Sequence, residues 1–245
     1  MESVSSSCFD PPHTSSPLNS NRRDHIYSPG NTVSPPRTSS RNYSSTSADP
    51  ELGRPPLPTN IRLLTVNCCS VRTNSSSFKA SLDYIKPDLV CGTESWLRGI
   101  KPGKDPEPNA IKNCEVFPET LTVHRNDRNI LKGGGVFTAS REGIVTDALP
   151  DLTSECEIVW SKVKVRDTRD ILLCSFYMPH RNMNDIKELD FSFNRLSHNQ
   201  KDKTIILAGD FNCPDINWPH QTVSKDAPDR EIQQALIDFA IEHGL

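Results

Sequence analysis

Four apolar runs in this sequence each end on polar side chains that could carry out chemistry. The polar residues are Asn67, Glu94, Tyr177 and the pair Asp210 and Asn212. Active sites of layered α/β folds lie at the ends of strands, where loops meet, so these side chains are expected to converge in the fold. Together they offer carboxylate, amide and phenol groups.

Glu94 follows the apolar run 88–92, and Asn67 ends the run 61–67. A carboxylate at a strand end can bind a hard cation such as Mg²⁺, which takes few protein ligands and keeps its waters. The amide oxygen of Asn67 could bind the same metal or orient Glu94. Each residue alone also fits a plain role, as a solvated strand-end glutamate or as a turn-forming asparagine.

The sequence Gly-Asp-Phe-Asn at 209–212 follows the apolar run 204–208. Asp210 and Asn212 are two residues apart, so an extended backbone points both side chains the same way. The carboxylate can take a proton from a water, and the amide can donate to a phosphate oxygen or hold the carboxylate in place. A plain turn can have the same sequence, but the apolar strand before it favours a functional interpretation.

Tyr177 ends the apolar run 171–176 and precedes Met178 and Pro179. A phenol beside a phosphate can stabilise negative charge that develops on an oxygen. Taken alone, the residue is more simply interpreted as an aromatic side chain at a strand edge. Its value as a candidate therefore depends on what lies beside it.

Two arginines, Arg125 and Arg128, precede the glycine run 133–135. The glycine spacing matches neither a phosphate-binding P-loop nor a dinucleotide fingerprint, so a hairpin that leads into a strand is the favoured interpretation. The two guanidinium groups are candidates for contacts with nucleic-acid phosphates. Solvated surface arginines are the alternative.

The elements that must position these residues follow from the spacing of apolar side chains. A strand at 61–67, a helix at 77–85 and a strand at 88–92 form a predicted β-α-β unit. Further strands are predicted at 115–117, 121–125, 134–139, 144–149, 158–165, 171–177 and 204–208, and helices at 185–196 and 231–243. Buried strands, two of them flanked by helices, predict a layered α/β fold.

The first part of the chain has a different composition. Residues 1–60 hold 10 of the 20 prolines, long serine runs and few aliphatic side chains. Such a segment cannot bury enough apolar surface to offset the entropy lost on ordering. Residues 1–58 are therefore predicted to be a disordered tail, and 59–245 the folded domain.

Charge and cysteine content narrow the function classes. The net charge is −3, so the chain lacks the basic surplus of many DNA-binding domains. This argues against tight non-specific binding of DNA but allows a local basic strip. None of the eight cysteines has the CxxC spacing of a zinc site, and a reducing compartment is expected, nuclear or cytoplasmic rather than secreted. No apolar run approaches a membrane span, and no membrane partner is expected.

In their order along the chain these motifs resemble the endonuclease/exonuclease/phosphatase superfamily, in particular the apurinic-type endonuclease domain of non-LTR retrotransposons. The resemblance covers roughly residues 60–245. It rests on Asn67, on 93–96 (Thr-Glu-Ser-Trp), on 125–128 (Arg-Asn-Asp-Arg) with its glycine run, on 177–179 (Tyr-Met-Pro) and on 209–212.

The resemblance implies a four-layered α/β sandwich with DNA as its partner. It implies that Glu94, helped by Asn67, binds Mg²⁺, with Mn²⁺ as an alternative. It also implies that Asp210 activates or positions the attacking water, that Asn212 supports the phosphate and that Tyr177 lies beside the scissile group.

Two departures from the family pattern bear on activity. Some members carry an aspartate two residues after the asparagine, where this chain has Cys69. The Ser-Asp-His element that normally ends the domain does not occur before Leu245. The sandwich is therefore expected to be incomplete and to lack its last strands, which leaves a sheet edge unpaired. Whether this chain is itself an enzyme stays open.

Three functions remain. The first is a Mg²⁺-dependent DNA endonuclease of retrotransposon origin, monomeric, with a reverse transcriptase region in the full-length element. The second is a phosphatase or lipid phosphodiesterase of the same fold, which suits the negative net charge. The third is a catalytically inactive truncated remnant or binding module, which the absent Ser-Asp-His element suggests.

Overall fold

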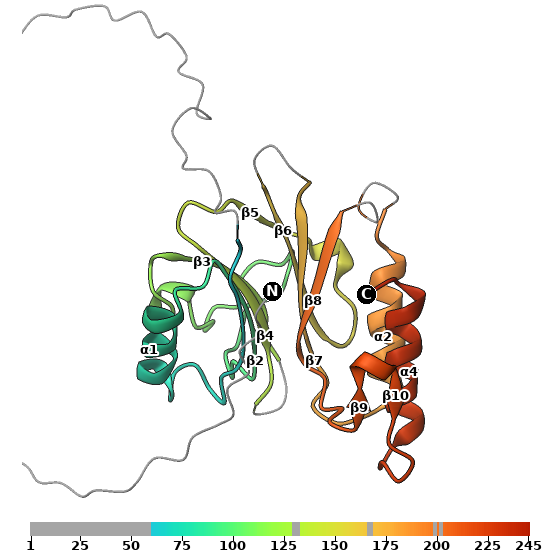
Figure 1. The fold of residues 1–245 in the computed structure, drawn as a ribbon. Coiled ribbons are helices and arrows are strands. Elements are labelled where there is room, and N and C mark those ends of the chain that lie inside the picture. The colour runs from blue at the N-terminus through green and yellow to red at the C-terminus, as the bar shows by residue number, and fades with distance from the viewer. Residues whose placement is uncertain (1–59, 129–132, 166–168, 198–199, 201–202) are drawn as a thin grey trace, which may run out of the picture. The chain divides into compact units, whose positions relative to one another are not determined.

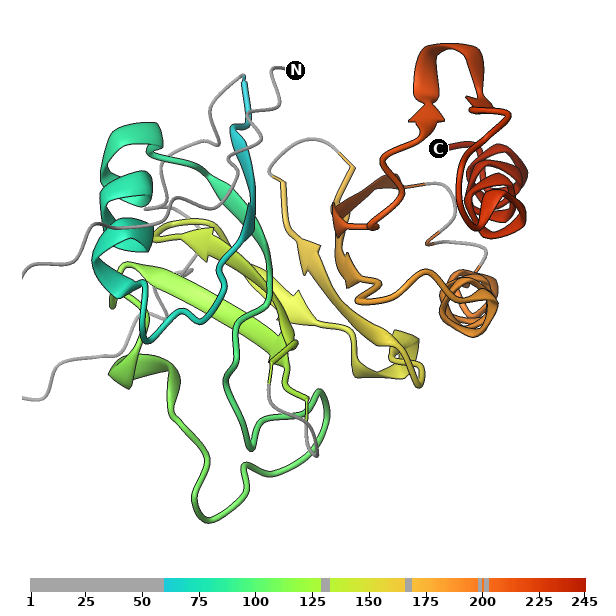
Figure 2. The same cartoon turned by 90° about the horizontal axis from the view of Figure 1, so that it is seen from below.

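The computed structural model describes residues 60–128, 133–165, 169–197, 200 and 203–245, so the predicted tail at 1–58 lies outside the described residues. Two four-stranded sheets pack face to face, and helices cover their outer faces (Figure 1). Seen from below, the helices lie on the outer side of each sheet (Figure 2). The predicted layered α/β fold is confirmed, with four layers.

The first sheet has the strand order β1-β2-β4-β3. Its strands are β1 (Leu63–Asn67), β2 (Leu89–Thr93), β3 (Leu121–Asn126) and β4 (Val136–Arg141). Helix α1 (Ser75–Ile85) joins β1 to the parallel strand β2, as the β-α-β prediction requires. The other two pairings in this sheet are antiparallel.

The second sheet has the order β5-β6-β7-β8. Its strands are β5 (Thr146–Ala148), β6 (Glu157–Val163), β7 (Ile171–Tyr177) and β8 (Thr204–Asp210). Helix α2 (Met183–Asn194) joins β7 to the parallel strand β8, which makes a second β-α-β unit. Helix α4 (Arg230–Glu242) packs beside α2 on the outer face.

Several short elements differ from the sequence-based expectation. The predicted strand at 115–117 is replaced by the 3-10 helix η1 (Asn113–Glu115), whose Glu115 side chain accepts from the backbone N–H of Lys112 at 2.7 Å. Phe117 is buried by packing against other rings and not by strand pairing. A small hairpin of β9 (Ile216–Asn217) and β10 (Thr222–Val223) was not predicted, because two-residue strands carry no periodicity.

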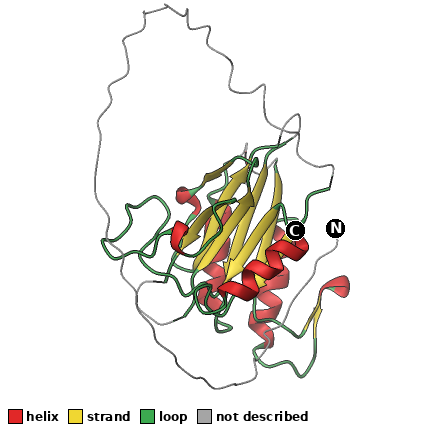
Figure 3. Ribbon diagram, turned by 90° about the vertical axis from the view of Figure 1, so that its left-hand side faces the viewer, coloured by secondary structure: helices red, strands yellow, loops and turns green. Residues whose placement is uncertain are grey.

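Two further 3-10 helices complete the described part of the chain. These are η2 (Pro150–Leu152) and η3 (Trp218–His220). Figure 3 shows the strands gathered at the centre of the domain with helices outside them. No helix among the described residues is both long and apolar enough to cross a membrane.

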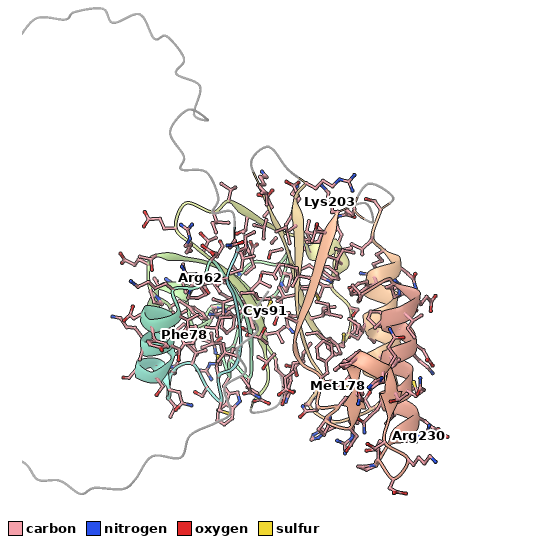
Figure 4. The ribbon with its side chains drawn as sticks, in the orientation of Figure 1. Arg62, Phe78, Cys91, Met178, Lys203 and Arg230 are labelled. Carbon is pink, nitrogen blue, oxygen red and sulfur yellow. The ribbon has the colours of Figure 1, made fainter. Side chains whose placement is uncertain are left out.

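Three apolar layers hold the sandwich together. Between α1 and the first sheet, the ring of Phe78 meets the ring of Phe137 edge to face, 6.0 Å between centroids. Cys91 lies in the layer between the two sheets, and Figure 4 labels it there. Between the second sheet and its helices, the ring of Trp160 meets that of Phe193 edge to face, with 4.9 Å between centroids. With both sheets covered on both faces, the strand ends and the loops that follow them are left for function.

Strand β8 differs from the buried strand that its sequence predicts. It forms an edge of the second sheet within the described residues, and Ile205, Ile206 and Leu207 are only half-buried. Edge strands present unpaired backbone groups on one side. This strand carries Asp210 at its end, so one side of the candidate site lies close to a sheet edge.

Candidate active site

The two parallel strand pairs bring their carboxyl ends to the same end of the sandwich. The side-chain N–H of Asn67, at the end of β1, donates to Oδ2 of Asp210 at 3.0 Å. The Tyr177 hydroxyl, at the end of β7, donates to Oε1 of Glu94. Each hydrogen bond joins one sheet to the other, so the four residues form a single cluster. Met178, labelled in Figure 4, marks this end of the molecule.

Glu94 is held by three donors. Besides the phenol of Tyr177, the indole N–H of Trp96 and the backbone N–H of Gly134 both donate to Oε2, the latter at 3.2 Å. Glu94 and Trp96 have φ angles of +53° and +54°. Side chains other than glycine rarely adopt this left-handed conformation, and functional sites are among the places where it is found. The backbone here is shaped to present the carboxylate.

Asp210 is oriented by its neighbours in a different way. Its Oδ1 accepts from the backbone N–H of Asn212 at 3.1 Å, while Oδ2 accepts from Asn67. Gly209 precedes it, and a Cβ on that residue would lie 1.9 Å from the carbonyl oxygen of Phe176. The glycine in Gly-Asp-Phe-Asn is therefore needed for the close approach of β8 to β7.

The side chain of Asn212 forms a hydrogen bond with the main chain in this structure. Its side-chain N–H donates to the carbonyl oxygen of Met178 at 2.7 Å, and its φ angle is +50°. This bond ties the turn after β8 to the turn after β7. The amide can still offer its second N–H to a phosphate, because a primary amide has two.

Cys69 occupies the position where some relatives of this pattern carry an aspartate. Its backbone N–H and its thiol approach Oδ1 of Asn67 at 3.2 and 3.4 Å. The thiol therefore lies beside the amide oxygen that was predicted to help bind a metal. It supplies a soft sulfur donor where a carboxylate would supply a hard oxygen.

The structure places Arg125 in the interior, which corrects the expectation that it contacts nucleic acid. Its side chain and that of Asp127 are 0% exposed, and their charged groups pair at 3.1 Å. Arg125 also donates to Asn113 Oδ1 at 3.1 Å and to the carbonyl oxygen of Ile111. Its guanidinium group holds the loop between β2 and β3 in place and does not face solvent.

Arg128 reaches the surface in part, with a side chain 22% exposed. It pairs with Glu157, the first residue of β6, whose Oε1 accepts from Arg128 Nε at 2.5 Å. The other carboxylate oxygen of Glu157 accepts from the backbone N–H of Gly135. Burial raises the pKa of the Glu157 carboxyl. Sequence reasoning missed Glu157, and the signal available was a charged residue that directly precedes an apolar strand.

A hollow of about 570 Å³ adjoins this ion pair. Lys101, Lys104, Arg128 and His180 contribute basic groups to it, and Glu155 and Glu157 contribute acidic ones. Lys101 Nζ donates to Oδ1 of Asn126 at 2.9 Å, and burial lowers the pKa of its ammonium group. The hollow borders the cluster, since Glu157 pairs with Tyr177 across β6 and β7.

The donor set at the strand ends fits a hard cation better than zinc. The groups there are the carboxylates of Glu94 and Asp210 and the amide oxygen of Asn67, all oxygen donors. Among the described residues no group of three or more His, Cys, Asp and Glu side chains could hold a metal. Mg²⁺ needs only one or two carboxylates because it keeps several waters.

Comparison with known proteins agrees with this geometry. Residues 171–245, which include Tyr177 and Asp210, match the family described as endonuclease-reverse transcriptase. A search of curated proteins finds no match. Solved structures match over most of the described domain, at sequence identities that bear on the fold alone.

Three of the similar structures illustrate the likeness. The endonuclease domain of TRAS1, a telomere-specific non-LTR retrotransposon, has a TM-score of 0.52 and 17% identity over 75% of this chain. The AP endonuclease LMAP from Leishmania major gives 0.54 and 16% over 75%. The catalytic domain of Xenopus laevis APE2 gives 0.51 and 12% over 73%. This chain covers 72%, 66% and 67% of their respective lengths.

The chain therefore has the fold of the endonuclease/exonuclease/phosphatase superfamily. Within that fold it resembles the endonucleases of non-LTR retrotransposons, as the sequence motifs imply.

Proposed function

We propose that the domain at 59–245 is a divalent-metal-dependent phosphodiesterase that cuts DNA, an endonuclease of the retrotransposon type. One observation carries the proposal: the hydrogen bonds from Asn67 to Asp210 and from Tyr177 to Glu94 join both sheets into one oxygen-rich cluster. The family match over 171–245 and the likeness to the TRAS1 endonuclease domain support it.

Asp210 is the proposed general base. The water oxygen bonds to phosphorus, the proton of that water passes to the carboxylate, and the bond from phosphorus to the leaving sugar oxygen breaks. The leaving oxygen takes a proton from solvent. Asn67 holds Asp210 by the bond of 3.0 Å, so the carboxylate is in place before the substrate arrives.

Tyr177 and Asn212 are proposed to contact the phosphate. The phenol of Tyr177, which donates to Glu94 in the free protein, can turn its O–H to a phosphate oxygen on which charge develops. The second N–H of the Asn212 amide can do the same. Glu94, with Asn67, would hold Mg²⁺ or Mn²⁺, and a bound metal ion supplies positive charge that stabilises the transition state.

The hollow beside the cluster is the proposed path of the DNA strand. Lys101 and Lys104 lie along it, and basic side chains account for much of phosphate binding in DNA-binding proteins. This local group of cations reconciles DNA as a substrate with the net charge of −3. We further propose a monomer in the nucleus or cytoplasm, and a reverse transcriptase region elsewhere in the full-length element.

The experiment is a nicking assay on supercoiled plasmid with the full chain. Conversion to open circles is expected with Mg²⁺ or Mn²⁺, and EDTA should stop it. Glu94→Gln serves as the matched control because it keeps the size of the side chain and removes its charge. Folded wild-type protein that leaves the plasmid intact at every metal concentration would contradict the proposal and favour an inactive remnant.

A smaller phosphate ester is the second candidate substrate. The acidic side chains of Glu155 and Glu157 in the hollow favour it, because they would repel a continuous DNA backbone. The same protein should then hydrolyse an inositol phosphate or sphingomyelin while plasmid remains intact. DNA cleavage without turnover of these esters would rule it out.

A further inference from the structure

Three consecutive glycines form a loop that is bonded to the segment that carries Glu94. Gly133, Gly134 and Gly135 have φ angles of +92°, +68° and +83°. The N–H of Gly134 donates to Glu94 Oε2. The carbonyl oxygens of Gly135 and Gly134 accept from the N–H groups of Ser95 and Trp96 at 3.1 and 2.8 Å. The glycine loop thus determines where one of the donors to the Glu94 carboxylate lies.

Glu157 and Arg128 hold this loop from the other side. One carboxylate oxygen of Glu157 accepts from the N–H of Gly135, and the other accepts from Arg128. The guanidinium group also lies against Gly134, since a Cβ on that glycine would be 2.4 Å from Arg128 Cζ. One side chain therefore fixes the loop by a hydrogen bond and the other by direct packing.

The charges of Arg128 and Glu157 offset each other beside Glu94. Burial, and to a smaller extent the charge of Glu94, raise the pKa of the Glu157 carboxyl. Arg128 offsets the negative charge of Glu157, while Glu157 keeps the guanidinium group against the loop. Strand pairing also places Glu157 opposite Tyr177, another residue that donates a hydrogen bond to Glu94. The pair lies where it can act on the Glu94 carboxylate without touching a substrate.

We propose that Arg128 and Glu157 are positioning residues that fix the Glu94 carboxylate for metal binding, through the backbone N–H of Gly134. The inference rests on the proposed function, because it takes Glu94 as the metal-binding carboxylate. It assigns Arg128 a role other than contact with nucleic acid. It also gives Glu157 a role that its sequence context did not indicate.

The test compares two ion pairs of similar exposure. Glu157→Gln and Arg128→Gln each keep a polar side chain and remove one charge. Lys203 and Asp170 pair at 3.1 Å with side chains 24% and 27% exposed, against 22% and 17% for Arg128 and Glu157. Lys203 lies at the opposite end of the sandwich from Met178 (Figure 4). Lys203→Gln is therefore the matched control.

The first readout is direct binding of Mn²⁺, followed by electron paramagnetic resonance. Affinity is expected to fall about tenfold in Glu157→Gln and in Arg128→Gln, the size of effect seen when groups that orient metal ligands are removed. Lys203→Gln should bind Mn²⁺ as wild type does. The double variant of Arg128 and Glu157 should lose less than the product of the single losses, because the two residues act as a unit. Equal Mn²⁺ affinities in all four variants and the wild type would overturn the proposal.

The second readout needs no metal. Hydrogen exchange of the Gly134 N–H, followed by NMR, is expected to be about tenfold faster in Glu157→Gln and unchanged in Lys203→Gln, because a local hydrogen bond limits it. Unchanged exchange in Glu157→Gln would overturn the proposal even if the wild type bound no metal. A wild type that binds Mn²⁺ but leaves DNA intact would refute the proposed DNA cleavage alone, because both readouts of positioning would still apply.

Discussion

The two β-α-β units of the sandwich each present a carboxylate, but they hold it in different ways. Asp210, in the second unit, is the last residue of β8. The N–H of Asn212, two residues away, donates to its Oδ1, and the side chain of Asn67, in the first unit, donates to its Oδ2. Glu94, in the first unit, follows β2 in a left-handed conformation. Besides Trp96, two residues away, its partners are Tyr177 and Gly134, which are 83 and 40 residues away in sequence.

The Asp210 side and the Glu94 side of the site therefore depend on different contacts. The Asp210 side depends on a short turn, on the hydrogen bond from Asn67 and on a glycine that lets β8 approach β7. The Glu94 side depends on the glycine loop and on the Arg128–Glu157 pair that holds it. Changes in the glycine loop and its ion pair should therefore alter the Glu94 carboxylate, whereas the Asp210 carboxylate should respond to changes in its own turn and at Asn67.

The largest expected effect follows from removal of the proposed general base, Asp210. Asp210→Asn keeps the shape of the side chain and one of its two acceptor oxygens, which can still accept from Asn67, but it cannot take a proton from water. The rate of plasmid nicking should fall about a thousandfold, within the range for removal of a general base. The rate constant under saturating DNA is the measurement, and the thermal midpoint should stay within a few degrees of wild type. A rate within tenfold of wild type would remove Asp210 from the mechanism.

The second-largest expected effect is a loss of stability when the buried Arg125 is replaced. Arg125→Ala leaves the carboxylate of Asp127 buried without its partner, which should lower the free energy of unfolding by about 3 kcal/mol. Urea denaturation measures it. Lys164→Ala, which breaks a pair with side chains 50% and 44% exposed, is the control and should cost about 1 kcal/mol or less. Similar losses in the two variants would mean that Arg125 does not hold the interior together.

The strand ends could be predicted because each closes an apolar run, which is local information. Asn67, Glu94, Tyr177 and Asp210 were expected to converge on that basis, and the structure brings them together. The β-α-β unit and most strands followed from the same periodicity. The four layers came from the resemblance to a known fold, because periodicity alone does not say how two sheets stack.

The role of the arginines could not be read from the sequence. Whether Arg125 is buried depends on how the loop 98–113 folds over it, and that loop has no periodicity. Arg128 and Glu157 are 29 residues apart, and nothing in the spacing links them. Charged residues are predicted to be exposed by default, so contacts that neutralise them inside a fold appear only in the structure.

The third effect concerns the hydrogen bond from Tyr177, at the end of the second sheet's β7, to Glu94, which follows β2 of the first sheet. Tyr177→Phe removes one hydroxyl, which donates to Glu94 in the free protein and is proposed to face the phosphate during cleavage. The nicking rate should fall about a hundredfold, as when one donor to a developing oxyanion is lost. Single-turnover kinetics measure it, and Mn²⁺ affinity separates the two roles. Weaker metal binding with an unchanged rate at saturating metal would show that the hydroxyl acts only on Glu94.

The smallest effect compares the two walls of the hollow. One wall carries Lys101, from the loop after β2 in the first sheet, and the other carries His180, from the loop after β7 in the second sheet. If a DNA strand lies there, Lys101→Ala should raise the KM for DNA about threefold and lower the slope of log affinity against log salt by about one, since one phosphate contact is lost. His180→Ala is the comparison on the other wall, and a smaller change of its salt slope is expected if the strand runs along the Lys101 side. Identical salt slopes in wild type and Lys101→Ala would mean that the strand passes elsewhere, and that the hollow belongs to the positioning of Glu94 alone.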